Sequence, residues 1–151
     1  MLYIEDSDDD LWLDLVELLS ERQIHDMVLC LYPGSGSDDF PEPFSVSCSP
    51  DSLEQVIVCS DGNEPPCSGR VRVSGELLDL LRSYTGEFED WGDSLLLYQP
   101  RERQWVAAFI PHQRIALVKD VRLQDFLDAA GIKAGTESPP GLDPSLIDAS
   151  E

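Results

Sequence analysis

Three short apolar segments joined by two tight turns occupy residues 94–119, and they limit the possible folds more than any other feature of the chain. The segments read SLLLYQ, QWVAAFI and RIALVK, and the turns between them read PRER and PHQ. Connections this short join antiparallel strands, since a parallel crossover needs about a dozen residues or more. The pattern therefore predicts a three-stranded antiparallel meander.

An acidic run followed by apolar residues at helical spacing predicts the first helix, over roughly 8–22. Ser7 is expected to cap a free backbone N–H, and the acids after it meet the positive end of the helix dipole. The apolar stripe faces the core and leaves much of the remaining helix surface negative. This expected stripe consists of Leu11, Trp12, Leu15, Val16, Leu18 and Leu19.

Two further helices are predicted from their ends. Ser74 precedes GELLDLLRSY, whose leucines fall on one side, and Gly86 ends that segment. The last helix begins near Val121 and stops at Gly131.

The remaining apolar segments predict strands. They are MVLCLY at 27–32, FSVSCS at 44–49, Arg70–Val73 and, with a helix turn as the alternative, DSLEQVIVCS at 51–60. About three helices on a mainly antiparallel sheet, without a repeat, predict a single α+β domain over 1–132. Residues 133–151 are rich in Pro, Gly, Ser and acids, so we expect a flexible tail there.

Charge is the strongest signal in the composition. Thirty acidic side chains oppose ten basic ones, which gives a formal net charge of -20 on 151 residues. Residues 1–69 hold sixteen Asp and Glu against Arg22 alone. This charge argues against binding to nucleic acid or to an anionic membrane surface, because both are negative. It favours a basic protein partner, with solubility alone as the other explanation.

The sequence gives no sign of secretion or of membrane insertion. The N-terminal stretch MLYIEDSDDD lacks a positive region, and no run reaches the roughly 18 apolar residues of a membrane span. We therefore expect a cytoplasmic protein whose four cysteines are free thiols. The spacing of these cysteines lacks the close pairs of a structural zinc site.

The sequence holds no complete catalytic, metal or cofactor motif. A nucleophilic enzyme would pair Cys30 or Cys67 with His25 or His112, but both histidines lie in expected connections, where solvated side chains are usual. The adjacent acids of SDDD point in different directions on a helix, and they do not match a calcium loop. The glycines of PGSGSDD precede acids, which would repel phosphate. We expect no catalytic residue, no metal and no cofactor.

The segment EFEDWGD at 87–93 places two aromatic residues among four acids. Interfaces concentrate binding energy in aromatic anchors, while surrounding charge steers the partner. In the other interpretation, Trp91 packs into the core and the acids face water.

In size, acidity, the meander SLLLYQPRERQWVAAFIPHQRIALVKD and the short closing helix, residues 1–132 resemble the small acidic immunity proteins that bacteria encode beside polymorphic or secretion-delivered toxins. The resemblance implies a protein that binds a cognate toxin in a 1:1 complex and blocks its active site or the access of its substrate. A nuclease toxin is favoured among the classes, because a cleft that accepts phosphates would also accept carboxylates. The resemblance transfers no functional residue.

Two other functions remain open. One is a nucleic-acid mimic that inhibits a DNA- or RNA-binding enzyme, with carboxylates in place of phosphates. The other is a small enzyme or ligand-binding module with an unrecognised pocket near His112 or Cys67.

The candidate partner-binding residues come from three acidic segments: the first helix, the loop after the first long strand, and the segment 87–93. They are Asp8, Asp9, Asp10, Asp14, Glu17, Glu21, Asp38, Asp39, Phe88, Glu89, Asp90, Trp91 and Asp93.

Overall fold

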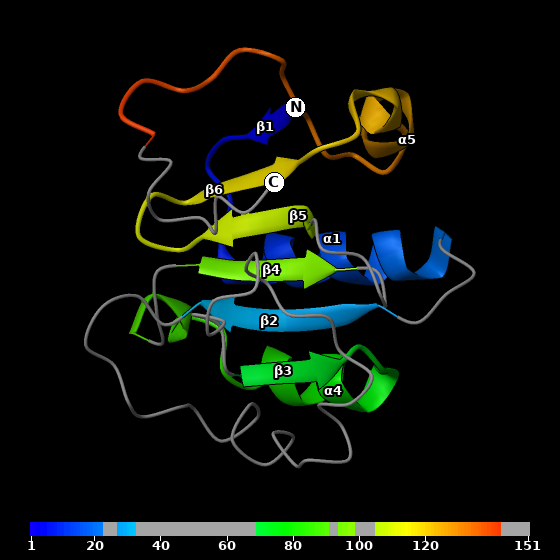
Figure 1. The fold of residues 1–151 in the computed structure, drawn as a ribbon, viewed down its shortest axis with the longest axis vertical. Helices are drawn as coiled ribbons and strands as arrows, with labels where there is room; N and C mark the ends of the chain where they lie inside the picture. The colour runs from blue at the N-terminus through cyan, green and yellow to red at the C-terminus, as the bar shows by residue number, and fades with distance from the viewer. Residues whose placement is uncertain (23–26, 33–68, 91–93, 99–104, 143–151) are drawn as a thin grey trace, which may run out of the picture.

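The computed structural model describes residues 1–22, 27–32, 69–90, 94–98 and 105–142. Within these ranges the chain forms a six-stranded antiparallel sheet of order β1-β6-β5-β4-β2-β3 (Figure 1). Its strands are β1 (Leu2–Ile4), β2 (Val28–Tyr32), β3 (Gly69–Arg72), β4 (Ser94–Tyr98), β5 (Trp105–Ile110) and β6 (Ile115–Val118). Because β4, β5 and β6 pair in sequence order, the predicted meander is confirmed.

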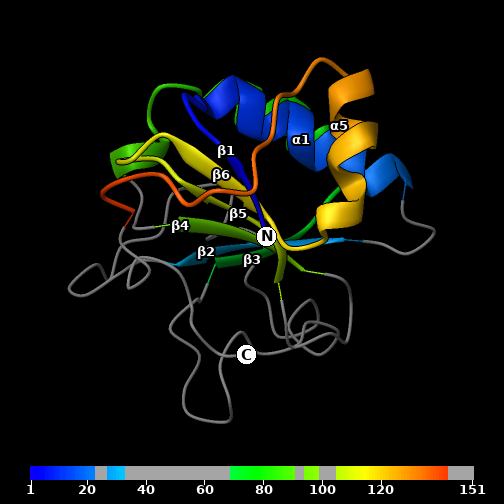
Figure 2. The same ribbon diagram turned by 90° about the horizontal axis from the view of Figure 1, so that it is seen from above.

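The described helices lie on one side of this sheet. They are α1 (Asp9–Arg22), α4 (Gly75–Arg82) and α5 (Gln124–Ala129), with short 3-10 turns η1 (Phe88–Asp90) and η2 (Val121–Leu123). Figure 2 shows α1 and α5 above the same face of the sheet, and the buried leucines of α4 belong to the same core as those of α1. A helical layer on an antiparallel sheet confirms the predicted α+β class.

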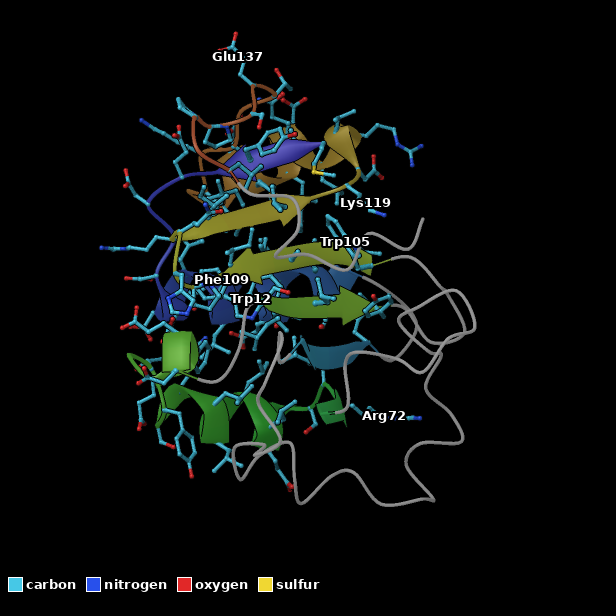
Figure 3. The ribbon with its side chains drawn as sticks, turned by 60° about the vertical axis from the view of Figure 1, so that its left-hand side comes forward. Trp12, Arg72, Trp105, Phe109, Lys119 and Glu137 are labelled. Carbon is cyan, nitrogen blue, oxygen red and sulfur yellow. The ribbon has the colours of Figure 1, made fainter. Side chains whose placement is uncertain are left out.

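The main core fills the space between the helices and the sheet. Alternate strand residues point into it, as the two-residue period of a strand requires. Trp12 of α1 stacks on Phe109 of β5, with ring centroids 5.7 Å apart and an interplanar angle of 17° (Figure 3). Both side chains are almost completely buried, so this pair fixes α1 over the middle of the sheet.

The opposite face of the meander is also apolar and buried. It carries Leu96, Tyr98, Trp105, Ala108, Ile110, Ile115 and Leu117. Trp105 lies on this face, with the Lys119 ammonium 4.5 Å from its ring centroid (Figure 3). Burial on both faces explains why these strands read as continuous apolar runs.

The start of α1 differs from the prediction in its capping residue. Asp8 is the cap, because its Oδ1 accepts a hydrogen bond from Leu11 N at 2.8 Å. The Ser7 hydroxyl is buried and donates to Ile4 O at 2.8 Å instead. Ser7 N also donates to Arg114 O, which ties the entry of α1 to the β5–β6 turn. Asp and Ser are both preferred N-cap residues, so the sequence does not show which of Ser7 and Asp8 caps the helix. The backbone path decides between them.

Two of the other predicted helix ends, at Ser74 and Gly131, are confirmed, whereas α4 ends at Arg82, four residues before the predicted Gly86. Ser74 Oγ accepts from Leu77 N at 3.1 Å at the start of α4. After α5, Gly131 adopts a positive φ of 84°, and Ile132 N donates to Leu127 O at 2.9 Å. This bond and the positive φ of Gly131 belong to a Schellman motif, in which glycine avoids the strain of a left-handed backbone.

The short edge strand β1 was not predicted. It pairs with β6 in the register Leu2 with Val118 and Ile4 with Ala116. On its other side, Tyr3 N donates to Gly135 O at 2.7 Å and Gly135 N donates to Tyr3 O at 2.9 Å. The boundary at residue 132 stays a prediction, but residues 133–142 follow this edge of the sheet (Figure 1), and Leu142 packs against the apolar face around Trp105.

Several predicted segments lie outside the described residues. These are the strands at 44–49 and 51–60 and the part of the tail beyond residue 142. Among the described helices, none combines the length and the apolarity that crossing a membrane requires.

Candidate functional site

The outward face of α1 carries a row of carboxylates. Asp10, Asp14, Glu17 and Glu21 are separated by four, three and four positions, which places them on one side of the helix about 5–6 Å apart. All four residues are exposed. The opposite side of α1 supplies Trp12, Leu15, Val16 and Leu19 to the core. The sequence period therefore produces both the packing of α1 and its negative outer face.

A groove of about 600 Å³ runs between α1 and the end of α5. Its acidic side consists of Asp8, Asp10, Asp14, Glu17 and Glu21. Its apolar residues are Leu11, Leu18 and Ile132, and the small residues Ala130 and Gly131 complete the wall opposite α1. We call this feature the α1–α5 groove.

The local structure explains why apolar side chains reach this groove. Leu11 and Leu18 are seven residues apart, so they share one flank of α1 and remain half-buried there. The Schellman motif after α5 returns the chain sharply at Gly131 and directs Ile132 to the same place. Ile132 is 8% exposed, so it belongs to the core and also lines the groove.

A second hollow, of about 460 Å³, lies on the other side of the start of α1. Its lining includes Asp8, Asp9, Asp10, Thr85, Glu89 and Arg114. The hollow shares Asp8 and Asp10 with the α1–α5 groove, so the negative surface is continuous around this end of the helix. Arg114 supplies a positive charge at the second hollow, whereas none of the described residues that line the groove is basic.

Asp9 has a structural role within this surface. Its Oδ2 accepts hydrogen bonds from Gly86 N at 2.6 Å and from Phe88 N at 3.3 Å. Burial raises the pKa of Asp9, the charges of Asp8 and Asp10 raise it further, and the two backbone hydrogen bonds oppose the rise. Asp9 therefore anchors the turn after α4 to the start of α1.

Arg82 links α4 to the acidic face of α1. Its Nη2 lies 2.8 Å from Asp14 Oδ1 and 3.2 Å from Glu17 Oε2. The hydrogen bond to Asp14 is the main reason that the pKa of Arg82 is raised. Even so, the side chains of Asp14 and Glu17 remain 61% and 51% exposed, so a second cation has access to both.

The predicted contact residues have different positions in the structure. Six of them surround the groove or the second hollow with exposed side chains: Asp8, Asp10, Asp14, Glu17, Glu21 and Glu89. Asp9 is half-buried and bonded as described, and Asp90 is exposed at the end of η1. Asp38, Asp39, Trp91 and Asp93 lie outside the described residues.

Phe88 requires a correction. Its side chain is fully buried in the main core, so it does not offer an aromatic contact to a partner. The reason is local, because the 3-10 turn η1 directs Phe88 inward while Glu89 and Asp90 face solvent. The apolar part of the candidate site comes from Leu11, Leu18 and Ile132 instead.

The sequence did not identify these three residues as part of a site. Leu11 and Leu18 were assigned to the buried stripe, although their angular position on the helix is at its margin. Ile132 carries no functional signal in sequence, since its place depends on the turn at Gly131. Helical-wheel geometry could have identified the two leucines, but only the tertiary structure adds Ile132.

The described part of the chain contains no group of three His, Cys, Asp or Glu residues arranged to hold a metal ion. His112 is exposed in the turn between β5 and β6, and Cys67 lies outside the described residues. The arrangement on the described surface is suited to binding cations next to small apolar contacts.

Comparison with known proteins returned no match to a family model, to a curated protein or to a solved structure.

Proposed function

We propose that this chain is an immunity protein that binds and neutralises a cognate bacterial toxin through the acidic surface around α1. The partner is a basic protein, with a nuclease favoured among toxin classes, and the complex has 1:1 stoichiometry. Binding covers the active site of the toxin or blocks the access of its substrate. The chain acts in this role as a binding protein in the cytoplasm, without chemistry or a cofactor of its own.

The observation that best supports this proposal is the α1–α5 groove. Five carboxylates line it beside three apolar side chains, and no basic residue is among the described lining. A groove that combines carboxylates with apolar side chains matches a basic partner better than a uniformly solvated acidic face would. Solubility alone does not require such an arrangement, because scattered charges serve it equally well.

The net charge of -20 acts at longer range than the groove. A negative inhibitor that approaches a positive cleft gains association rate, and the effect decreases as salt screens the charges. Once bound, carboxylates in a phosphate-binding cleft also exclude a nucleic-acid substrate. This reasoning favours a nuclease over toxins that act on neutral substrates.

Co-expression with the toxin encoded beside this gene provides the test. We expect the wild-type chain to restore growth and to elute with the toxin as a 1:1 complex. Asp10→Asn with Glu21→Gln removes two exposed charges from the groove and should weaken the complex. Glu76→Gln with Asp79→Asn removes the same charge from exposed positions on α4 and serves as the matched control.

Three results would contradict the proposal in different ways. Equal weakening by both double variants would show that net charge matters and the groove does not. A complex with a DNA- or RNA-binding enzyme, competed by nucleic acid and steeply salt-dependent, would support the mimic. Turnover of a small molecule that is lost in His112→Ala, without any protein partner, would establish an enzyme.

A further inference from the structure

We infer that the α1–α5 groove binds an amphipathic basic helix of the partner, one that presents leucine-like side chains on one face and Lys or Arg beside them. This inference rests on the proposed function, since it specifies which part of a basic partner enters the site. It begins from the shape and the chemistry of the groove. The row from Asp8 to Glu21 extends about 20 Å along α1, which is the length of about 14 helical residues.

The apolar residues of the groove fit a helix in their spacing. Leu11 and Leu18 are two turns apart, about 10 Å along the axis, and Ile132 faces them from the end of α5. An amphipathic helix presents apolar side chains at positions i, i+3, i+4 and i+7, which recur at the same interval. Ala130 and Gly131 have little or no side chain, so a helix can approach this wall closely.

An extended segment fits the groove less well than a helix. Binding of a strand depends on backbone hydrogen bonds to a free sheet edge. The described walls of the groove come from α1 and the turn after α5, and neither offers such an edge. A helix satisfies its own backbone groups and needs only side-chain contacts from its receptor.

The acidic row already binds one guanidinium within the protein. Arg82 contacts Asp14 through Oδ1 and Glu17 through Oε2. Each carboxylate has two oxygens and about four acceptor positions, so the pair retains capacity for a further cation. Asp10 and Glu21 lie beyond Arg82 toward the two ends of the same row. Lys or Arg at helical spacing on the partner matches these four carboxylates.

A peptide experiment tests the groove without the toxin. The probe is a fluorescein-labelled Leu/Lys peptide of about 14 residues with its leucines on one helical face. The control peptide has the same composition in an order without helical periodicity. We expect the amphipathic peptide to bind roughly tenfold more tightly and to gain helical circular dichroism on binding.

Two neighbouring variants locate the binding position. Ala130 lines the groove and Ala129 does not, and both are exposed at the end of α5. Ala130→Arg places a cation in the groove and should weaken binding of the amphipathic peptide roughly tenfold. Ala129→Arg makes the same change in net charge and should weaken binding of the same peptide by less than about twofold. Thermal melts of both variants establish that each is folded.

The possible results test binding of a helix in the groove separately from the immunity function. Equal binding of the two peptides, or equal loss in the two variants, overturns the inference that an amphipathic helix enters the groove. Full rescue from the toxin by Ala130→Arg also overturns it, while leaving the immunity function established. Loss of both peptide binding and rescue in Ala130→Arg, with both retained in Ala129→Arg, supports it.

Discussion

The guanidinium of Arg82 on α4 lies 2.8 Å from the Asp14 carboxylate on α1, and it also reaches Glu17. The two helices are far apart in sequence, and between them they contribute eight of the residues that fill the core. The ion pair crosses their outer surface, where it neutralises part of the acidic row. Packing therefore holds the two helices together, and Arg82 reduces the negative charge of the outer face of α1.

Arg82→Ala should change stability only slightly. Ion pairs between partly exposed side chains contribute at most about 1 kcal/mol, because solvent screens them and ordering costs side-chain entropy. We expect a decrease of that size or less in the free energy of unfolding, measured by urea denaturation. Arg122→Ala is the comparison, since Arg122 pairs with Asp120 two residues away and its side chain is 86% exposed. A loss of several kcal/mol at Arg82 would contradict this account.

The stability of the protein should depend on which side chain replaces Asp9. Asp9→Ala removes the acceptor for Gly86 N and Phe88 N and should cost about 1 kcal/mol in unfolding free energy. Asp9→Asn keeps an acceptor oxygen and removes a charge that burial disfavours, so at pH 7 it should be at least as stable as the wild type.

The pH dependence of the Asp9 variants follows from the same site. The pKa of Asp9 is raised in the folded protein above its ordinary 3.8, so the native state takes up this proton before the unfolded chain does. The stabilisation that comes from protonating Asp9 in the folded protein is complete below pH 3.8, and it is lost as the pH rises through the folded pKa. The wild type should therefore gain stability relative to Asp9→Asn as the pH falls from 7 toward about 4. Denaturation curves of both proteins across this range measure the difference, and a gain by the variant would contradict the prediction.

Gly131→Ala should destabilise the protein by about 1 kcal/mol. Gly131 has a φ of 84°, which an L-residue adopts only with strain, although an added Cβ would meet nothing within 4 Å. Gly75→Ala is the matched control, because Gly75 begins α4 without a positive φ and also has open space around it. We expect that control to be neutral or stabilising, since alanine restricts the unfolded chain. Thermal unfolding by circular dichroism measures both changes.

Phe109→Ala should cause the largest decrease in the free energy of unfolding among these single substitutions. It removes the partner on which Trp12 stacks and leaves a cavity between α1 and the sheet. Such deletions cost about 3–5 kcal/mol. Phe109→Leu should lose less and remains measurable if the alanine variant does not fold. Val121→Ala, at a 47% exposed position, should lie within about 0.5 kcal/mol of the wild type in urea denaturation.

The elements with strong local signals were predictable from sequence. The meander follows from its short turns, the buried side of α1 from its period, and the end of α5 from Gly131. These features depend on neighbours within a few positions, which a sequence displays directly. The negative outer face of α1 was predictable for the same reason.

The features that escaped prediction depend on distant residues or on weak local signals. β1 has three residues, too few to show a period, and it becomes a strand because β6 and Gly135 pair with it. Phe88 looked like a surface aromatic because acids surround it, but the turn η1 directs it into the core. The groove needs Ile132 from one end of the chain beside Leu11 and Leu18 from the other.

The pairing of β1 also has a consequence for how the protein is made. Residues 2–4 are synthesised long before their hydrogen-bond partners at 116–118 and at Gly135. At about 5–20 residues per second, the ribosome leaves this segment and the apolar side of α1 unpaired for several seconds. During that interval the mutual repulsion of nascent chains, which carry sixteen acids against one arginine through residue 69, opposes their aggregation. The same carboxylates that we assign to partner binding thus protect the unfinished chain before any partner can be met.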